Sequence, residues 1–231
     1  MKNKIVAIQG DNLKKINILS DTSIFLAYEA QKKNYKIFYY QPKDLSIINN
    51  KIFANGKFIK FNYKNKNFYK IIKKQKLDLK KSKFILVRQD PPFNLEYITT
   101  THILEILKNK VKIINNPVAI RNISEKLYSS YFMKFMPDTI FSQNLIEIKN
   151  FFKKNKKIVI KPIHGYGGND IHLIKNFKVK FIIKLIKSHG HLMCQKYLEN
   201  IKFGDKRVFI INGQVKGAIS RVPKKGSFLS N

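Results

Sequence analysis

Residues 161–168 combine a lysine with three glycines, a pattern that suits the binding of a phosphate group. The segment reads Lys-Pro-Ile-His-Gly-Tyr-Gly-Gly and follows an apolar run that predicts a strand. Glycines let backbone N–H groups turn toward an anion, and Lys161 adds a positive point charge. The lysine precedes the glycines, unlike in a P-loop, and no helix opens directly after them, unlike in a dinucleotide-binding fingerprint. A flexible hairpin turn is the alternative interpretation.

Three other groups of residues indicate little individually and must be considered in their order along the chain. Lys126 stands near a predicted helix start, where a surface lysine is the simpler interpretation. Residues 195–199 read Gln-Lys-Tyr-Leu-Glu, which is either an ordinary edge strand or a link whose backbone could meet an adenine edge. Asp205 and Arg207 place a carboxylate and a guanidinium at the start of another strand, or form a solvated charge cluster. Each simpler interpretation is plausible by itself, but all of them together in this order, with Lys161, are less so.

The first half of the chain alternates strand and helix signals, which is typical of a doubly wound parallel sheet. Asp21 or Thr22 is expected to cap the first helix, and Asn55-Gly56 is expected to turn a hairpin. The inner side of that helix is predicted to carry Ile24, Phe25, Ala27 and Tyr28. The predicted elements are a strand over 4–9, a helix to about residue 33, a strand over 36–40, a hairpin over 46–61, a strand over 84–87, a helix near 95–108 and a strand over 111–114. Asn115-Asn116-Pro117 then breaks the pattern and marks a domain boundary.

The second half has a different pattern, in which short strands follow one another around the glycine loop. Gly213 is expected to turn the last hairpin. The predicted elements are a helix over 124–133, strands over 157–161 and 171–174, a helix over 179–188, a strand over 193–198 and hairpin strands over 207–212 and 214–220.

The formal net charge of +32 invites a nucleic-acid interpretation, because lysines neutralise phosphates. Arginine, which suits guanine and phosphate best, occurs only at 88, 121, 207 and 221, and the lysines are scattered along the whole chain. A bias toward residues with AT-rich codons explains the charge better, so no specific nucleic-acid partner is expected. No apolar run approaches the roughly 18 residues that span a bilayer. The single cysteine, Cys194, fits a reducing cytoplasm.

The order of these segments resembles the ATP-grasp superfamily, and three further stretches resemble bacterial glutathione synthetases within it. Residues 21–31 read DTSIFLAYEAQ, similar to the family's DSTFAMLLEAQ-like helix, and residues 218–223 read AISRVP, similar to its A-R-I/V-P segment. The most specific stretch is VRQDPPFNLEY at 87–97, which is similar to R-K-D-P-P-F-D-x-E-Y with Gln89 for Lys and Asn94 for Asp. Two adjacent prolines suit a rigid loop at the end of a strand.

The resemblance implies an α/β fold in two parts. A Rossmann-like (pre-ATP-grasp) parallel-sheet domain would occupy residues 1–120 and carry the substrate, and an ATP-grasp domain would occupy residues 121–231. It implies a cytoplasmic ligase that uses ATP and Mg²⁺ to join γ-glutamylcysteine to glycine through an acyl phosphate, and a homo-oligomer.

The resemblance also implies a role for each matching residue. Lys126 and Lys161 would hold phosphates under a mobile loop formed by Gly165, Gly167 and Gly168. The adenine would meet Gln195, Tyr197 and Leu198, and the ribose would meet Asp205. Arg207 and Arg221 would steady the phosphates or the acyl phosphate, and Arg88 and Asp90 would lie on the peptide-substrate side.

The chain departs from the family pattern at its end. Family members continue with an R-x-N-L-x-x-G-G stretch and then the magnesium ligands, whereas this chain has Leu229 in place of the arginine and ends at Asn231. The ATP-grasp domain is therefore expected to be incomplete, with the Mg²⁺ ligands beyond residue 231. The alternatives are a non-catalytic ATP-binding remnant of the family and, on charge alone, a basic nucleic-acid-binding protein.

Overall fold

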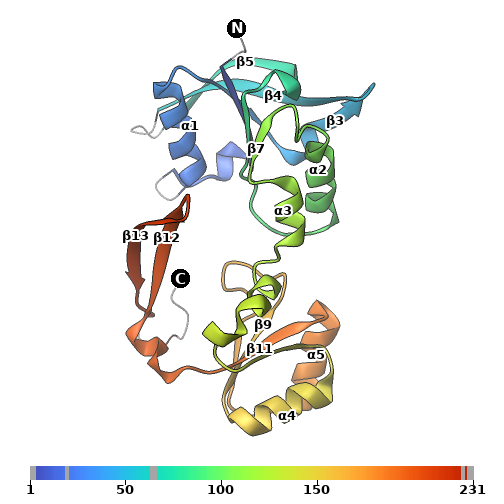
Figure 1. Ribbon diagram of the computed structural model, residues 1–231, viewed down its shortest axis with the longest axis vertical. Coiled ribbons are helices and arrows are strands. Elements are labelled where there is room, and N and C mark those ends of the chain that lie inside the picture. The colour runs from blue at the N-terminus through green and yellow to red at the C-terminus, as the bar shows by residue number, and fades with distance from the viewer. Residues whose placement is uncertain (1–3, 19–20, 63–66, 225–226, 228–231) are drawn as a thin grey trace. The chain divides into compact units, whose positions relative to one another are not determined.

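The computed structural model describes residues 4–18, 21–62, 67–224 and 227, and the expected departure at Leu229 and Asn231 lies outside them. The chain forms two compact units, Met1–Ile123 and Ser124–Asn231, each with its own sheet (Figure 1). No helix in the described part of the chain is long and apolar enough to cross a membrane.

Unit 1 is built on a seven-stranded mixed sheet in the order β3-β4-β2-β1-β6-β7, with β5 on the other side of β4. Pairing is parallel among β2, β1, β6 and β7, and antiparallel wherever β4 takes part. The strands are β1 (Ile5–Gln9), β2 (Lys36–Tyr40), β3 (Leu45–Ile48), β4 (Lys51–Phe61), β5 (Tyr69–Asp78), β6 (Phe84–Val87) and β7 (Lys112–Ile114). The helices are α1 (Thr22–Lys32), α2 (Leu95–Glu105) and α3 (Pro117–Asn122), with 3₁₀ turns η1 (Leu13–Lys15), η2 (Pro42–Asp44) and η3 (Leu79–Lys81).

The two faces of this sheet are covered by different helices (Figure 1). On one face Ile24 and Ala27 of α1 pack against the strands, and on the other face Leu104 of α2 does so. The strand β1 is buried along its whole length, as expected of a central parallel strand with a continuous apolar run. The predicted cap of α1 is confirmed, because the Asp21 carboxylate accepts hydrogen bonds from two backbone N–H groups. Phe25 is 46% exposed, so its predicted inner position is wrong.

The hairpin predicted over 46–61 turns at a different place. Asn49 and Asn50, with φ of 47° and 58°, form the turn between β3 and β4. Asn55-Gly56 lies inside β4, where a Cβ on Gly56 would come within 2.5 Å of the Phe38 ring. Gly56 therefore allows close approach of the neighbouring strand, and the asparagines supply the left-handed turn. The strand β5 was not among the predicted elements.

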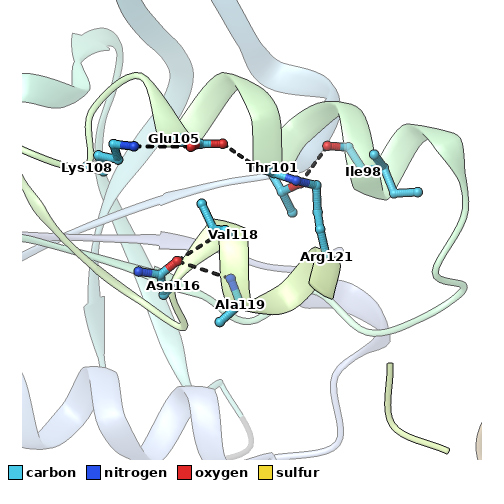
Figure 2. Close-up of polar contacts among 8 residues, drawn as sticks. All are labelled: Ile98, Thr101, Glu105, Lys108, Asn116, Val118, Ala119 and Arg121. Atoms are coloured by element: carbon cyan, nitrogen blue, oxygen red, sulfur yellow. Dashed lines mark hydrogen bonds and ion pairs between the residues drawn. The ribbon is translucent and has the colours of Figure 1, made fainter. Parts of the chain in front are cut away.

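The helices α2 and α3 are joined by a polar network in which Arg121 takes part (Figure 2). The Arg121 guanidinium pairs with Glu105 and donates a hydrogen bond to the Thr101 hydroxyl at 3.2 Å. The Asn116 side chain caps α3 by accepting hydrogen bonds from the Val118 and Ala119 N–H groups (Figure 2). These contacts give Arg121 a role in packing the two helices together.

Unit 2 contains a four-stranded antiparallel sheet in the order β10-β9-β11-β8 and a separate two-stranded ribbon. The sheet strands are β8 (Thr139–Ser142), β9 (Ile158–Pro162), β10 (His172–Ile174) and β11 (Leu192–Lys196), and the ribbon strands are β12 (Asp205–Ile211) and β13 (Gln214–Arg221). The helices are α4 (Leu145–Asn155) and α5 (Val179–His189), with 3₁₀ segments η4 (Leu127–Phe135) and η5 (Glu199–Phe203). The predicted ribbon turn is confirmed, with Asn212 and Gly213 at φ of 52° and 75°.

The helix predicted over 124–133 is a 3₁₀ segment, η4, with a non-helical residue at Phe132. Two serines and several aromatic residues lower the α-helical propensity of this segment. The Ser129 hydroxyl also donates to the Lys126 carbonyl, which competes with regular helical hydrogen bonding. Lys126 therefore stands just before a tight turn and not in the first turn of an α-helix.

Candidate functional site

Alternation of side chains along β9 and β11 gives the sheet of unit 2 one apolar face and one face that lines a cavity. Ile158 and Ile160 of β9, and Cys194 of β11, pack against α4 and α5. The intervening residues, among them Val159 and Lys161, line a cavity on the opposite face. Successive strand residues point to opposite sides, so the apolar core fixes which residues face the cavity.

The cavity has a volume of about 630 Å³ and is lined entirely by residues of unit 2. It brings together every residue that the sequence analysis assigned to the nucleotide or to catalysis, namely Lys126, Lys161, Gly165, Gly167, Gly168, Gln195, Tyr197, Leu198, Asp205, Arg207 and Arg221. Lys126 and Arg221, which are 95 positions apart in the sequence, thus line the same cleft. The four basic side chains of this set make the cleft positively charged, namely Lys126, Lys161, Arg207 and Arg221.

Lys161 is a partly buried cation of this cleft. Its ammonium donates a hydrogen bond to the Gln195 side-chain oxygen at 2.6 Å, and the Gln195 amide donates to the Thr139 hydroxyl at 3.0 Å. Burial lowers the pKa of Lys161, and the positive charge of Lys126 lowers it further. A negatively charged ligand would relieve both penalties, because it favours the charged form of the ammonium.

The glycine loop approaches Lys126, whose ammonium donates a hydrogen bond to the Gly165 carbonyl. Gly167 and Gly168 have φ of 61° and 79°, a left-handed conformation that glycine adopts without strain. Within the described part of the chain, no acceptor pairs with the N–H groups of Tyr166 and Gly168. This combination of a lysine and available loop N–H groups is suited to phosphate oxygens.

The ribbon contributes a paired carboxylate and guanidinium. Asp205 and Arg221 face each other across β12 and β13, and the guanidinium donates two hydrogen bonds of 2.7 Å to the two carboxylate oxygens. Among the described residues, the Arg207 side chain has neither a hydrogen-bond nor an ion-pair partner. Arg207 is therefore available to an anion in the cleft, whereas Arg221 is held in place by Asp205.

The far end of the cleft lies where β11 runs into the link at 197–198. The Tyr197 N–H donates to the Lys157 carbonyl at 3.0 Å, which holds the link against the sheet. The next N–H group, that of Leu198, has no acceptor among the described residues. Leu198 itself is 53% exposed. Val159 and Met193 provide apolar walls nearby. A flat heterocycle that offers an acceptor at its edge fits these groups.

Sequence reasoning missed several residues of this cleft. Val159 and Met193 each lie two positions before a predicted site residue on the same strand, so strand alternation could have found them. Thr139 does not line the cleft but accepts the hydrogen bond of Gln195. It lies on β8, which was not predicted, and no local signal connects it to Gln195. The Asp205–Arg221 pair is likewise a cross-strand contact that spacing alone does not reveal.

Magnesium ligands are not assembled in this cleft. The acidic residues that line it are Glu125 and Asp205, and Asp205 is already paired. In the described ranges there is no group of three or more His, Cys, Asp or Glu side chains that could hold a metal ion. The described residues therefore do not form a site that fits Mg²⁺.

The residues assigned to the peptide substrate lie in unit 1, at the carboxyl end of β6. The Arg88 guanidinium donates hydrogen bonds to the hydroxyls of Thr22 at 2.7 Å and Ser23 at 3.0 Å, at the start of α1. The Asp90 N–H donates to the Asp11 carboxylate at 2.8 Å. Burial raises the pKa of Asp90, and the negative charges of Asp11 and Asp21 raise it further.

Asp90 lines a second cavity, of about 230 Å³, and Arg88 is not among the residues that line it. The cavity is bounded by the loop that carries the cis peptide bond between Pro91 and Pro92. It also contains Gln89, whose side chain pairs with that of the buried Gln9. The structure thus separates the predicted pair, with Asp90 facing a cavity and Arg88 facing α1.

Comparison with known proteins identifies the family. The family models "Prokaryotic glutathione synthetase, N-terminal domain" and "Prokaryotic glutathione synthetase, ATP-grasp domain" match residues 5–121 and 125–231. Glutathione synthetase of Mesorhizobium japonicum is 36% identical over 236 residues, which cover 100% of this chain and 75% of the relative. That of Buchnera aphidicola subsp. Schizaphis graminum is 36% identical over 238 residues, which cover 100% of this chain and 74% of the relative.

Solved structures agree on the fold at much lower sequence identity. D-alanyl-alanine synthetase A from Vibrio cholerae matches with a TM-score of 0.60 and 12% identity, covering 100% of this chain and 71% of that one. A RimK-domain ATP-grasp protein from Sphaerobacter thermophilus matches with a TM-score of 0.60 and 12% identity, covering 94% and 72%. The fold is therefore that of ATP-grasp ligases, and the chain belongs to the prokaryotic glutathione synthetase family.

Proposed function

We propose that this chain is an ATP-dependent carbon–nitrogen ligase that joins γ-glutamylcysteine to glycine, giving glutathione, ADP and phosphate. One observation carries the proposal: Lys126, Lys161, Arg207 and the glycine loop line a single cleft in the unit that matches the ATP-grasp model. Family membership supplies the expected substrates.

The residues of the cleft fit a nucleoside triphosphate. The ammonium groups of Lys126 and Lys161 and the N–H groups of the glycine loop are suited to phosphate oxygens, and the Leu198 N–H is suited to an adenine acceptor. ATP supplies, when bound, the phosphoryl group that activates the carboxylate of the peptide substrate. Arg207 would steady the charge that develops on the transferred group, because its guanidinium has no partner among the residues that the structure describes. Arg221 would help to steady the phosphates or the acyl phosphate while its guanidinium remains hydrogen-bonded to Asp205.

We further propose that residues 121–231 hold the nucleotide and residues 1–120 hold the peptide substrate. The Asp90 cavity of unit 1 supports this division, because Asp90 and Asp11 could meet the amino group of a peptide. Arg88, held by Thr22 and Ser23, would act by fixing the start of α1 beside this cavity. A homo-oligomer in the cytoplasm remains part of the prediction, and light scattering and cell fractionation test it.

The test is phosphate release from ATP in the presence of magnesium, γ-glutamylcysteine and glycine. Release that requires all of these, together with glutathione detected by mass spectrometry, supports the ligase. The Lys126→Ala variant should lose transition-state stabilisation of roughly a few kcal/mol. Unchanged turnover in that variant would contradict the assigned cleft.

A second function, ATP binding without catalysis, is favoured by the missing set of metal ligands among the described residues. Magnesium-independent binding of ATP by calorimetry, with no phosphate release under any substrate combination, would select it. Tight, sequence-specific binding of DNA or RNA would contradict both functions, whereas weak binding that vanishes with salt is expected from the net charge alone.

A further inference from the structure

A third cavity lies in unit 1, on the same face of the sheet as α1. Its volume is about 520 Å³. One wall is formed by β4 and β5, where Asn55 and Lys57 stand opposite Lys76 and Lys74 in the strand register. The other walls are formed by the 3₁₀ turns η1 and η2. The cavity is thus built from elements far apart in the sequence, and none of them belongs to the ATP-grasp unit.

The charge of this cavity is strongly one-sided. Five lysines line it, at positions 14, 43, 57, 74 and 76, and none of them has an ion-pair partner among the described residues. Each of the two acidic residues in the lining accepts a hydrogen bond from one backbone N–H group. The Asp11 carboxylate accepts a hydrogen bond from the Asp90 N–H at 2.8 Å, and that of Asp44 from the Gln41 N–H at 3.0 Å.

The placement of Lys57 and Lys74 opposes folding in the absence of a ligand. Like charges that face each other across antiparallel strands repel, and neither lysine has an ion-pair partner within the described ranges. Lys76, on the same face, is fixed over the Phe53 ring at 4.9 Å from its centre. Lys57, Lys74 and Lys76 therefore all contribute to the wall that β4 and β5 give to the cavity.

The composition of the chain explains part of this pattern but not its convergence. A second cross-strand lysine pair, Lys60 and Lys70, lies on the same two strands and does not line the cavity. That pair projects from the opposite face of β4 and β5. It provides a matched comparison, because both are cross-strand lysine pairs on the same two strands.

We propose that the cavity lined by Lys14, Lys43, Lys57, Lys74 and Lys76 binds a small anion that carries several phosphate groups, at a site separate from the ATP-grasp cleft. Ammonium groups are compact point charges that suit phosphate oxygens without requiring a bidentate geometry. A polyphosphate would place negative charge between Lys57 and Lys74 and would reach the lysines of η1 and η2. The site does not depend on the proposed ligase activity.

The test uses fluorescence from inside the cavity, because the chain contains no tryptophan. Tyr69 lines the cavity, so the Tyr69→Trp variant carries a single reporter there. Inorganic tripolyphosphate is titrated into this full-length variant at about 0.15 M salt, which screens weak surface attraction. A saturable change in fluorescence is expected, and a Lys161→Met substitution in the same background should leave it unaltered.

Two double substitutions in the reporter background decide the outcome. Lys57→Gln with Lys74→Gln should weaken binding by about tenfold or more, and Lys60→Gln with Lys70→Gln by less than about twofold. Circular dichroism checks folding, and Lys14→Gln with Lys43→Gln replaces the first pair if that variant does not fold. Equal weakening by both pairs, or no saturable signal, would overturn the site. Equally tight binding of citrate would overturn the assignment to phosphate.

Discussion

The Lys161→Met substitution should weaken nucleotide binding strongly while changing the stability of the unliganded protein little. Methionine keeps a flexible apolar side chain of similar length and removes the ammonium. Lys161 is chosen because its environment is unfavourable to its own charge: burial and Lys126 both lower its pKa. Its partner is the Gln195 side-chain oxygen, 2.6 Å away.

The magnitudes follow from these contacts. A hydrogen bond from a charged donor contributes about 1.5–3 kcal/mol, and its loss is offset by relief of the buried charge and of the repulsion from Lys126. The net change in the free energy of unfolding should therefore stay within about 1 kcal/mol. In the complex, the ammonium would face a phosphate, and losing about 2–3 kcal/mol there raises Kd by about 30- to 150-fold.

The assay measures ADP affinity by calorimetry and thermal unfolding with and without ADP. At a concentration of about 100 times the Kd of the unmodified protein, ADP should stabilise that protein by about 2.7 kcal/mol and the variant by only about 0.6 kcal/mol. Lys157→Met is the control, because Lys157 immediately precedes β9, pairs with Glu199 on the surface at 2.6 Å and does not line the cleft.

Two results would refute this reasoning. The first is an ADP affinity that Lys161→Met and Lys157→Met reduce equally, since the effect would then come from net charge and not from the cleft. The second is a loss of several kcal/mol in the unliganded Lys161→Met protein, because the ammonium would then be a structural requirement and the affinity could not be interpreted.

Three other predictions concern the same fold. The pKa of Lys161 is lowered from 10.5, so rising pH should deprotonate its ammonium in the folded state before it does so in the unfolded state. In that alkaline window the free energy of unfolding of the unliganded protein should rise with pH. The affinity for ADP, measured by calorimetry, should fall over the same window. Gly204→Ala should destabilise the ribbon by about 1–3 kcal/mol, because φ is +92° and a Cβ would lie 2.3 Å from the Arg221 carbonyl; thermal unfolding should show no such loss for Gly217→Ala, where a Cβ meets no atom within 4 Å. Tyr40→Phe should raise the free energy of unfolding in urea by about 1 kcal/mol, because this buried hydroxyl has no hydrogen-bond partner in the part of the chain the structure describes.

The elements that the sequence predicts well are those whose local signals agree with their packing. The strands β1, β2 and β6 are short apolar runs in a buried sheet, and Asp21 caps α1 as its type suggests. Local signals competed over 46–61, where two asparagine-containing turn candidates occur within a few residues. Only the packing of Gly56 against Phe38 decides between them.

The strand β5 is hard to predict because its sequence contains many lysines, which weaken the apolar alternation typical of a strand. The strand β5 has a long exposed run rich in lysine, and its pairing with β4 is a tertiary preference and not an intrinsic one. In the cleft, the lysines and glycines that we propose hold phosphate are identifiable by type and order. The contacts between Gln195 and Thr139 and between Asp205 and Arg221 depend on strand register, which a single sequence does not specify.

The alternation along β9 and β11 separates two kinds of evolutionary change. Ile158, Ile160 and Cys194 pack against α4 and α5, whereas Val159 and Lys161 line the cleft and do not belong to that packed core. A substitution on the face that lines the cleft can therefore change which ligand binds without changing the packing of the core. Such a strand can exchange one chemistry for another by point substitutions at every second position, while the helices behind it keep the scaffold intact.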